Sequence, residues 1–521
     1  MRRLLFVAAA LIASCTPALA QTRGAFVMTM GKDTVAVERF ERDTGRLSGV
    51  TLFQMMNVRT DWSLELDADG SARRMKLEAR YANAPLGAKP LQEGTLEFWP
   101  DSVIGVLAGA RRAFPAKPGL LPYLNPSMVL FEQALRRSRT GGEAGEVDLF
   151  FVTGGNVATV PVTHTAPDTF VLGLGGTDVK LAVNPAGEVV GGAIPSQQIV
   201  FRRVEAMSLG SLVLAKPDYS APPGAHYVAE EVRVPSTEGF ELAGTLTRPR
   251  QATGRVPAVV TITGSGSEDR DEALTIVRGY RPFREVAEAL AARGIATLRL
   301  DDRGFGESGG SASNATSFDF SYDVEAALKF LRARPDIDGA RLALVGHSEG
   351  GLIAPIVAAR DSTLRGIVLL AGPAYTGRRI LDYQQRTAFA RMGYKGARLD
   401  SASAAAAAAT DSIARKSRWM SFFLDHDPLG IAKSVRTPVL VLQGATDRQV
   451  TAEQAKVLAG AFRAGGNRDV TLRVFPATNH LFLADPAGWG DGYSALPDPH
   501  VRREVLDAMG EWLAAKLAAK P

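Results

Sequence analysis

A serine between two glycines is the residue in this chain with the clearest capacity for chemistry. Segment 346–350 reads Gly-His-Ser-Glu-Gly, the G-x-S-x-G spacing, with an apolar strand-like run at 342–345 before it and an apolar helical stretch after it. The glycines allow a sharp turn that exposes the serine hydroxyl, and the helix N-terminus behind it favours negative charge. Because an ordinary glycine-rich turn would not need this context, the pattern predicts that Ser348 is a nucleophile.

A serine nucleophile needs a general base, and three histidines follow Ser348 in the chain. His480 lies in a predicted loop directly after the strand-like run 470–475. His426 lies inside a predicted helical insertion, and His500 begins the predicted terminal helix. A base is expected in the loop after the last strand, so His480 is favoured over the other two, and over a purely structural role in its own loop.

The base in turn needs an acid that orients it, and the acid should come between the serine and the histidine in the chain. Asp447 follows the apolar run 438–443 within a few residues, at the end of a predicted strand. Asp485 lies closer to His480 in sequence but beyond it, and we interpret it as a solvated loop residue. The sequence therefore predicts Ser348, Asp447 and His480 as a catalytic triad.

Charge that develops on a substrate oxygen needs backbone N–H donors aimed at it. One donor is expected from Glu349, the residue after the nucleophile. The other should come from the Gly-Ser-Gly-Ser loop at 264–267, which follows the strand-like run 256–263; Ser265 is the favoured donor and Gly266 the alternative. The sequence has neither an H-E-x-x-H pattern nor paired cysteines, so no metal and no cofactor are predicted.

Two domains are predicted to position these residues. Residues 21–220 contain short alternating strand-like runs separated by turns, with one helical stretch at 126–139, which indicates a β-rich domain, barrel-like or sandwich-like. Residues 226–521 alternate apolar strands with helices, which is typical of an α/β fold with a mostly parallel sheet. The role of the first domain is not predicted by any motif.

Residues 375–435 interrupt the alternation of the second domain. The segment includes an alanine run at 404–409 that predicts a helix, and it carries Trp419, Phe422 and Phe423. We interpret it as a helical lid over Ser348 whose aromatic side chains shape a substrate pocket. The alternative is that these rings only pack the helices of the insertion itself.

Composition limits the classes of partner. The 521 residues are 46% hydrophobic and 22% charged, with a formal net charge of +5, which describes an ordinary globular protein. The charge is too small to indicate nucleic-acid binding, and no later segment is long and apolar enough for a membrane span. Oligomeric state is not predicted.

Residues 1–20 have the pattern of a signal peptide, which predicts an exported protein, periplasmic or secreted. Two arginines precede a short apolar core, and Ala18-Leu19-Ala20 is a cleavage pattern before Gln21. The competing interpretation is a lipobox ending at Cys15, which would anchor the protein to a membrane by a lipid. Cys15 is the only cysteine, so no intrachain disulfide is predicted.

These motifs together resemble the EstD-like bacterial carboxylesterases of the α/β-hydrolase superfamily. The resemblance is carried by segments 263–271, 302–308, 346–351 and 479–482 and by Asp447, and it spans roughly residues 226–517. It implies an α/β-hydrolase domain with a serine mechanism, a small-molecule ester substrate, and an additional N-terminal domain. Related sequences are similar to serine peptidases and cinnamoyl esterases.

Three functions follow from these observations. The first is a carboxylesterase that acts through an acyl-enzyme intermediate. The second is a serine aminopeptidase or dipeptidyl peptidase of the same fold, in which carboxylates such as Glu268 and Glu349 would bind the substrate amine. The third is a glycan- or lipid-binding protein with a vestigial hydrolase domain, against which the complete triad argues.

Overall fold

The computed structural model describes residues 22–519 except 32, 54–57, 83–89, 108–109, 140–144, 154, 175–176, 206–216 and 275–276. The predicted signal peptide and Cys15 lie outside these residues. The chain divides into two compact units, one up to Lys216 and one from Pro217 onward. Searched for candidate spans, the described helices include none with the length and apolar character needed to cross a membrane.

The first unit is built on one sheet of 15 described strands, in the order β8-β7-β6-β5-β4-β3-β2-β1-β15-β14-β13-β12-β11-β10-β9. Neighbours pair antiparallel except β9 and β10, which are parallel. Among the described strands, these hydrogen-bonded neighbours form one sheet with β8 and β9 at its two ends. Their bounds are β1 (Thr22–Met30), β2 (Asp33–Asp43), β3 (Arg46–Phe53), β4 (Val58–Leu66), β5 (Ala72–Tyr81), β6 (Gln92–Phe98), β7 (Ser102–Leu107), β8 (Ala110–Pro115), β9 (Leu121–Tyr123), β10 (Glu146–Phe151), β11 (Asn156–Ala166), β12 (Thr169–Leu174), β13 (Thr177–Val183), β14 (Val189–Ile194) and β15 (Ile199–Val204).

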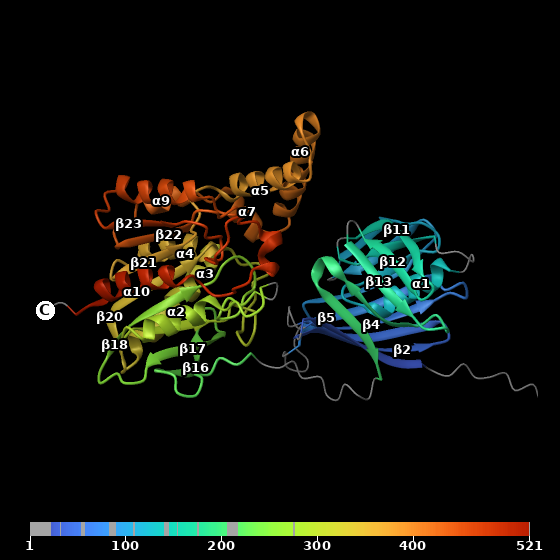
Figure 1. The fold of residues 1–521 in the computed structure, drawn as a ribbon, viewed down its shortest axis with the longest axis horizontal. Helices are drawn as coiled ribbons and strands as arrows, with labels where there is room; N and C mark the ends of the chain where they lie inside the picture. Colours follow the sequence, from blue (N-terminus) through green and yellow to red (C-terminus); the bar gives the residue numbers. More distant parts are fainter. Residues whose placement is uncertain are drawn as a thin grey trace, which may run out of the picture. The chain divides into compact units, whose positions relative to one another are not determined.

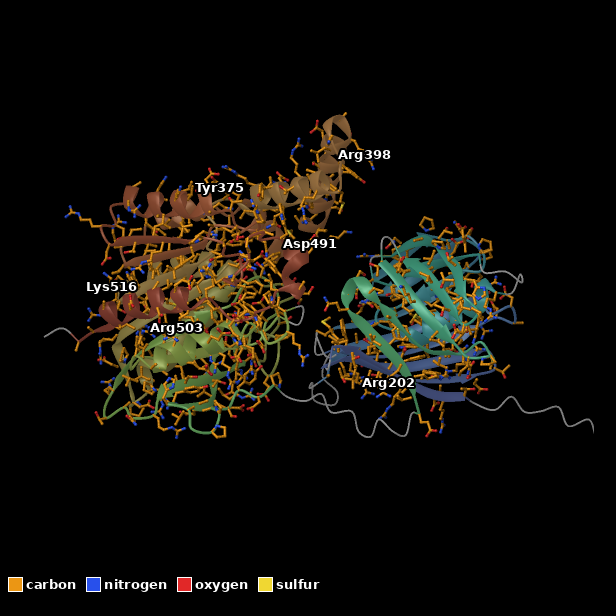
Figure 2. The ribbon with its side chains drawn as sticks, viewed as in Figure 1. Arg202, Tyr375, Arg398, Asp491, Arg503 and Lys516 are labelled. Atoms are coloured by element: carbon orange, nitrogen blue, oxygen red, sulfur yellow. The ribbon has the colours of Figure 1, made fainter. Side chains whose placement is uncertain are left out.

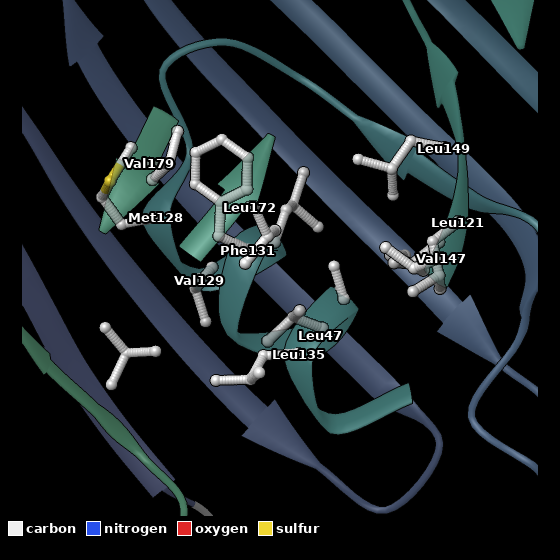
Figure 3. Packing of buried hydrophobic residues seen from close by; sticks show 14 of the residues in the cluster. Leu47, Leu121, Met128, Val129, Phe131, Leu135, Val147, Leu149, Leu172 and Val179 are labelled. Atoms are coloured by element: carbon white, nitrogen blue, oxygen red, sulfur yellow. The ribbon is translucent and has the colours of Figure 1, made fainter. Parts of the chain in front are cut away.

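The core of this unit forms around the single helix that the sequence predicts, α1 (Met128–Ser138). Figure 3 shows apolar side chains of α1 among strands from both halves of the sheet. Glu38 of β2 is fully buried and accepts the backbone N–H groups of Met128 at 2.7 Å and Val129 at 3.0 Å. A carboxylate at a helix N-terminus satisfies otherwise unpaired donors, so Glu38 fixes where the helix begins.

The second unit contains a sheet of eight described strands in the order β16-β17-β19-β18-β20-β21-β22-β23. The pairs β16–β17 and β17–β19 are antiparallel and the rest are parallel. This order, with one antiparallel hairpin leading into a parallel sheet, is that of the α/β-hydrolase fold. The strands are β16 (Tyr227–Pro235), β17 (Glu241–Pro249), β18 (Val256–Ile262), β19 (Ala296–Leu300), β20 (Ile337–His347), β21 (Gly366–Leu370), β22 (Val439–Gly444) and β23 (Val470–Phe475).

Helices cover both faces of this sheet (Figure 1). Alternate residues of the central strands enter opposite cores; in β22, Val439 and Val441 join one cluster while Leu440 and Leu442 join the other. This double burial explains why these strands are continuous apolar runs in the sequence. The first cluster is covered by α3 (Ser317–Ala333), α4 (Glu349–Arg360) and α9 (Ala452–Ala464), and the second by α2 (Pro282–Ala291) and α10 (Arg503–Leu517).

Between β21 and β22 the chain forms four described helices within the segment 375–435. They are α5 (Gly377–Arg391), α6 (Gly396–Ala414), which contains the alanine run, α7 (Arg418–Asp425) and α8 (Pro428–Ala432). Figure 1 shows α6 standing away from the sheet of its own unit, while Figure 2 places Tyr375 near the sheet and Arg398 at the far end of the insertion. The insertion therefore has an outer end, α6, whereas α7 contacts α3, one of the helices that cover the sheet.

Candidate active site

The predicted nucleophile lies in a strained turn where β20 becomes α4. Ser348 has φ 50° and ψ −111°, a conformation that residues with a side chain rarely adopt. A Cβ at Gly346 would lie 2.1 Å from the carbonyl oxygen of Gly350, and a Cβ at Gly350 would lie 2.1 Å from that of Ile262. The two glycines are therefore required by close backbone contacts, and the turn they allow leaves Ser348 half-buried at the end of its strand.

The predicted base and acid are hydrogen-bonded to each other. His480 Nδ1 lies 2.7 Å from Asp447 Oδ2, and both side chains are buried, with 4% and 2% of their surface exposed. Asp447 also accepts the side chain of Gln443 at 2.9 Å and the backbone N–H groups of Gln449 at 2.8 Å and Val450 at 2.9 Å. These contacts fix the carboxylate and leave His480 Nε2 as the nitrogen that can exchange a proton with a nucleophile.

The histidine loop and the nucleophile turn are in direct contact. His347, the residue before Ser348, has Nε2 3.0 Å from the backbone oxygen of His480, and the two imidazole ring centroids are 4.9 Å apart. Ser348, Asp447 and His480 follow β20, β22 and β23, so all three lie at the carboxyl edge of the parallel sheet. Ligand sites of open α/β sheets form at this edge.

Asp485 is a correction to the sequence interpretation, because it is buried rather than solvated. Only 4% of its surface is exposed. Its carboxylate accepts Asn479 Nδ2 at 3.2 Å and the backbone N–H of Ala487 at 2.9 Å. Asp485 therefore organises the loop that carries His480, and His480 itself contacts Asp447.

The loop after β18 approaches the nucleophile closely. A Cβ at Gly264 would lie 3.6 Å from Ser348 Cβ. The N–H of Gly264 is already used, because it donates to Glu268 Oε2 and Glu272 Oε1, each at 3.0 Å. In the described part of the chain, the backbone N–H groups of Ser265 and Glu349 donate to no protein acceptor. These are the two groups that the sequence predicts as oxyanion donors.

The side chain of Glu349 connects the nucleophile turn to the insertion. Its Oε1 accepts Ser317 Oγ of α3 at 2.6 Å and Trp419 Nε1 of α7 at 2.8 Å. Burial raises the pKa of Glu349, and the hydrogen bonds from Ser317 and Trp419 partly oppose this shift. Trp419 also stacks on Phe423 with ring centroids 5.2 Å apart. The residue that follows the nucleophile is thus fixed by a side chain of the insertion.

The remaining sequence candidates lie apart from the triad. His426 is the C-cap that follows α7 and stacks on Phe422 with ring centroids 4.8 Å apart, and burial lowers its pKa. His500 is exposed and pairs with Glu285 at 3.1 Å. Searched for metal ligands, residues 22–519 outside the gaps given above contain no group of three or more His, Cys, Asp or Glu side chains that could hold an ion.

Four residues of the site were missed by the sequence interpretation: Glu272, Ser317, His347 and Gln443. His347 is inside the Gly-His-Ser-Glu-Gly segment, so its position beside the nucleophile was visible, although its partner was not. Gln443 ends the strand that leads to Asp447, which was a weaker sign. Glu272 and Ser317 come from distant segments and had no recognisable pattern.

The sequence comparisons agree with the resemblance to EstD-like esterases. The profile of the family described as "Serine aminopeptidase, S33" matches residues 277–429, which include Ser348 and most of the insertion but neither Asp447 nor His480. Esterase EstD of Thermotoga maritima is 27% identical over 282 residues, 52% of this chain. The uncharacterized peptidase YuxL of Bacillus subtilis is 26% identical over 262 residues, 49% of this chain.

The chain spans 65% of the EstD sequence and 35% of the YuxL sequence. Among solved structures, the esterase Pf2001 of Pyrococcus furiosus aligns with 58% of this chain and 96% of its own, at 18% identity and a TM-score of 0.40. The dienelactone hydrolase described as putative from Klebsiella pneumoniae aligns with 55% of this chain and 98% of its own, at 20% identity and a TM-score of 0.36.

Proposed function

We propose that this protein is a serine hydrolase that cleaves carboxylic esters of small molecules. The observation that carries the proposal is the Asp447–His480 hydrogen bond of 2.7 Å, together with the strained turn that holds Ser348. A buried carboxylate on Nδ1 leaves the other imidazole nitrogen as a base, which is what a serine hydroxyl needs to become a nucleophile. The likeness to esterase EstD supports an ester as the substrate.

In the proposed reaction, Ser348 Oγ attacks the ester carbonyl carbon while His480 Nε2 takes the hydroxyl proton. The negative charge that develops on the carbonyl oxygen is held by the N–H groups of Ser265 and Glu349. Collapse of this intermediate breaks the bond to the alcohol oxygen, which receives the proton from His480. The acyl group remains on Ser348 until a water molecule, deprotonated by His480, attacks its carbonyl carbon. Breaking the bond to Ser348 Oγ then releases the acid, and His480 returns the proton to Ser348.

A serine aminopeptidase of the same fold is the second candidate, and the S33 profile favours it. Such an enzyme needs carboxylates that are available to bind the substrate amine. Glu268 accepts the Gly264 N–H, and Glu349 Oε1 accepts Ser317 and Trp419, so each carboxyl already forms hydrogen bonds within the site, although Glu349 Oε2 has no partner among the described residues. These contacts favour the esterase.

The two candidates are separated by a substrate screen. We expect the protein to hydrolyse p-nitrophenyl esters and to leave aminoacyl p-nitroanilides intact, because an amide is the harder bond to break. Release of p-nitrophenol and of p-nitroaniline is followed by absorbance over matched acyl and aminoacyl series. Turnover of the anilides with an equal or higher kcat/KM would identify a peptidase, and turnover of neither by folded protein would favour the binding-protein interpretation.

The insertion is part of the proposed function as a lid over Ser348. The support is the hydrogen bond from Trp419 to Glu349, the residue adjacent to the nucleophile, and the stacking of Phe423 on Trp419. Phe423 also packs on Gly377 at the start of the insertion, where a Cβ would lie 2.4 Å from its ring. Trp419 is therefore the ring that links the lid to the site, and Phe423 packs against Trp419.

Replacing these rings should change which esters are preferred. In Trp419→Ala and Phe423→Ala we expect the ranking of acyl chain lengths by kcat/KM to shift toward longer chains, because space opens beside the acyl group. The melting temperature should fall by only a few degrees, since Trp419 is half-buried. The measurement is the p-nitrophenyl ester series together with thermal unfolding.

Tyr383→Ala is the matched control, because this ring lies in the same insertion and is 37% exposed. It should leave both the chain-length ranking and the melting temperature unchanged. A loss of stability in the Trp419 and Phe423 variants with an unchanged ranking would mean that the insertion is only scaffold.

A further inference from the structure

A second buried histidine–carboxylate pair lies beside the proposed triad. His347 Nδ1 is 2.5 Å from Glu272 Oε1, and the two residues are 5% and 3% exposed. Glu272 comes from the segment after the Gly-Ser-Gly-Ser loop, 75 positions before His347. The proposed mechanism uses neither side chain. His347 is nevertheless adjacent to Ser348 in the chain and contacts the backbone of His480, and Glu272 contacts the loop that carries Ser265.

The proton positions on His347 follow from its two neighbours. Nε2 faces the backbone oxygen of His480 at 3.0 Å, and a carbonyl oxygen can only accept, so Nε2 carries a proton. Nδ1 faces the carboxyl of Glu272, whose charge raises the pKa of His347 although burial alone would lower it. The ring therefore donates from Nε2 to the histidine loop while Nδ1 is held by Glu272.

The same oxygen of Glu272 also holds the loop that carries the proposed oxyanion donor. Oε1 accepts the N–H of Gly264 at 3.0 Å, and Gly264 is bonded to Ser265. One carboxylate oxygen thus contacts the oxyanion loop directly, and through His347 it reaches the nucleophile turn and the backbone of the base. Three segments that are distant in sequence are joined at this point.

Glu272 is itself held firmly in place. Its φ of 56° is unusual for a residue with a side chain, and such conformations persist only where surrounding contacts enforce them. Its N–H donates to the backbone oxygen of Asp269 at 2.8 Å, and the N–H of Ala273 donates to the Asp269 carboxylate at 2.9 Å. Two residues earlier, Arg270 forms a buried ion pair of 2.7 Å with Asp301.

We propose that Glu272 and His347 are positioning residues, which hold the oxyanion loop, Ser348 and His480 in the relative positions that the reaction needs. This inference rests on the proposed serine mechanism. Neither residue touches the substrate. Because a displacement of about 1 Å at a reacting group can lower a rate on the order of 100-fold, loss of the pair should act on kcat more than on KM.

Two substitutions of His347 separate its two contacts. In His347→Gln the amide nitrogen can occupy the position of Nε2 and keep the bond to His480 O, while the bond to Glu272 is lost. In His347→Asn the amide nitrogen can occupy the position of Nδ1 and keep the bond to Glu272, while the bond to the histidine loop is lost. Each variant removes one hydrogen bond of the buried ring, so their melting temperatures should fall by similar amounts.

We expect His347→Asn to lower kcat for a p-nitrophenyl ester on the order of 10- to 100-fold with a small change in KM. His347→Gln should recover most of that loss, because it keeps the contact with the base. The rate at which a fluorophosphonate probe labels Ser348 should follow the same order. Glu272→Gln removes the charge opposite His347 Nδ1 but keeps an Oε1 that can accept from Gly264, and it should slow labelling less than His347→Asn.

His500→Gln is the control, because this histidine is 65% exposed and lies outside the site; it should behave as wild type. Equal labelling rates in wild type, His347→Asn and His347→Gln at equal folded concentration would overturn the positioning role, even if the ester is hydrolysed normally. Slower labelling of His347→Asn than of His347→Gln would support the role even if no tested ester is turned over. The labelling experiment therefore tests the positioning role of Glu272 and His347 independently of whether the protein hydrolyses esters.

Discussion

Ser348→Ala should abolish hydrolysis of p-nitrophenyl esters while leaving the protein folded. In a triad the serine, base and acid act as a unit, and loss of the nucleophile lowers kcat by about 10⁴- to 10⁶-fold. Alanine keeps the Cβ of serine, so the turn with φ 50° is no more strained than before. The measurement is the steady-state rate with a short-chain ester, together with thermal unfolding of both proteins.

Ser313→Ala is the control for this experiment, because Ser313 is an exposed serine in a surface loop of the same unit. It should retain full activity. Ordinary turnover by Ser348→Ala, with an unfolding transition like that of wild type, would rule out the serine mechanism.

Asp447→Asn should give the second largest loss, on the order of 10³- to 10⁴-fold in kcat. Asparagine can still fill the buried site, but its amide does not stabilise the imidazolium that forms when His480 takes a proton. An amide nitrogen facing Nδ1 would also favour the wrong tautomer of the ring. The contacts from Gln449 and Val450 go to the other oxygen, Oδ1, and can be kept, so the protein should stay folded.

Two further variants serve as comparisons for Asp447→Asn. Asp382→Asn changes an exposed carboxylate of α5 and should be without effect. Asp485→Asn alters the buried acid that holds the histidine loop, so it should lower thermal stability more than Asp447→Asn does while retaining measurable activity. An inactive Asp485→Asn beside an active Asp447→Asn would mean that the wrong acid has been named.

The second unit could be predicted from sequence to a large extent because its strands are buried on both faces. Such strands appear as short apolar runs, and segment 438–443 corresponds closely to β22, all of whose residues are buried. Segment 470–475 corresponds to the edge strand β23, which is only partly buried. The hairpin of β16 and β17 was not recognised; its edge strand β16 has several exposed residues and therefore a weaker apolar pattern. The first unit was recognised as β-rich, but pairing between distant strands leaves no local pattern, so its single continuous sheet was not foreseen.

In the proposed site, too, some residues could be predicted from the sequence and others could not. The Gly-His-Ser-Glu-Gly segment has a recognisable spacing because close backbone contacts exclude other residues at Gly346 and Gly350. Glu272 is not part of a motif with a fixed spacing. Its contact with His347 depends on the tertiary fold and on a backbone φ of 56°, which the sequence does not predict. Asp485 was misjudged for a related reason, since its burial depends on how the loop folds back on Asn479.

The most direct test of the proposed function is to trap the acyl-enzyme. The protein is mixed with a short-chain p-nitrophenyl ester, quenched in acid during turnover, and measured by intact mass and peptide mass spectrometry. We expect a mass increase equal to one acyl group, located on Ser348 and absent from Ser348→Ala. Rapid release of p-nitrophenol with no adduct, or with an adduct on another residue, would contradict it.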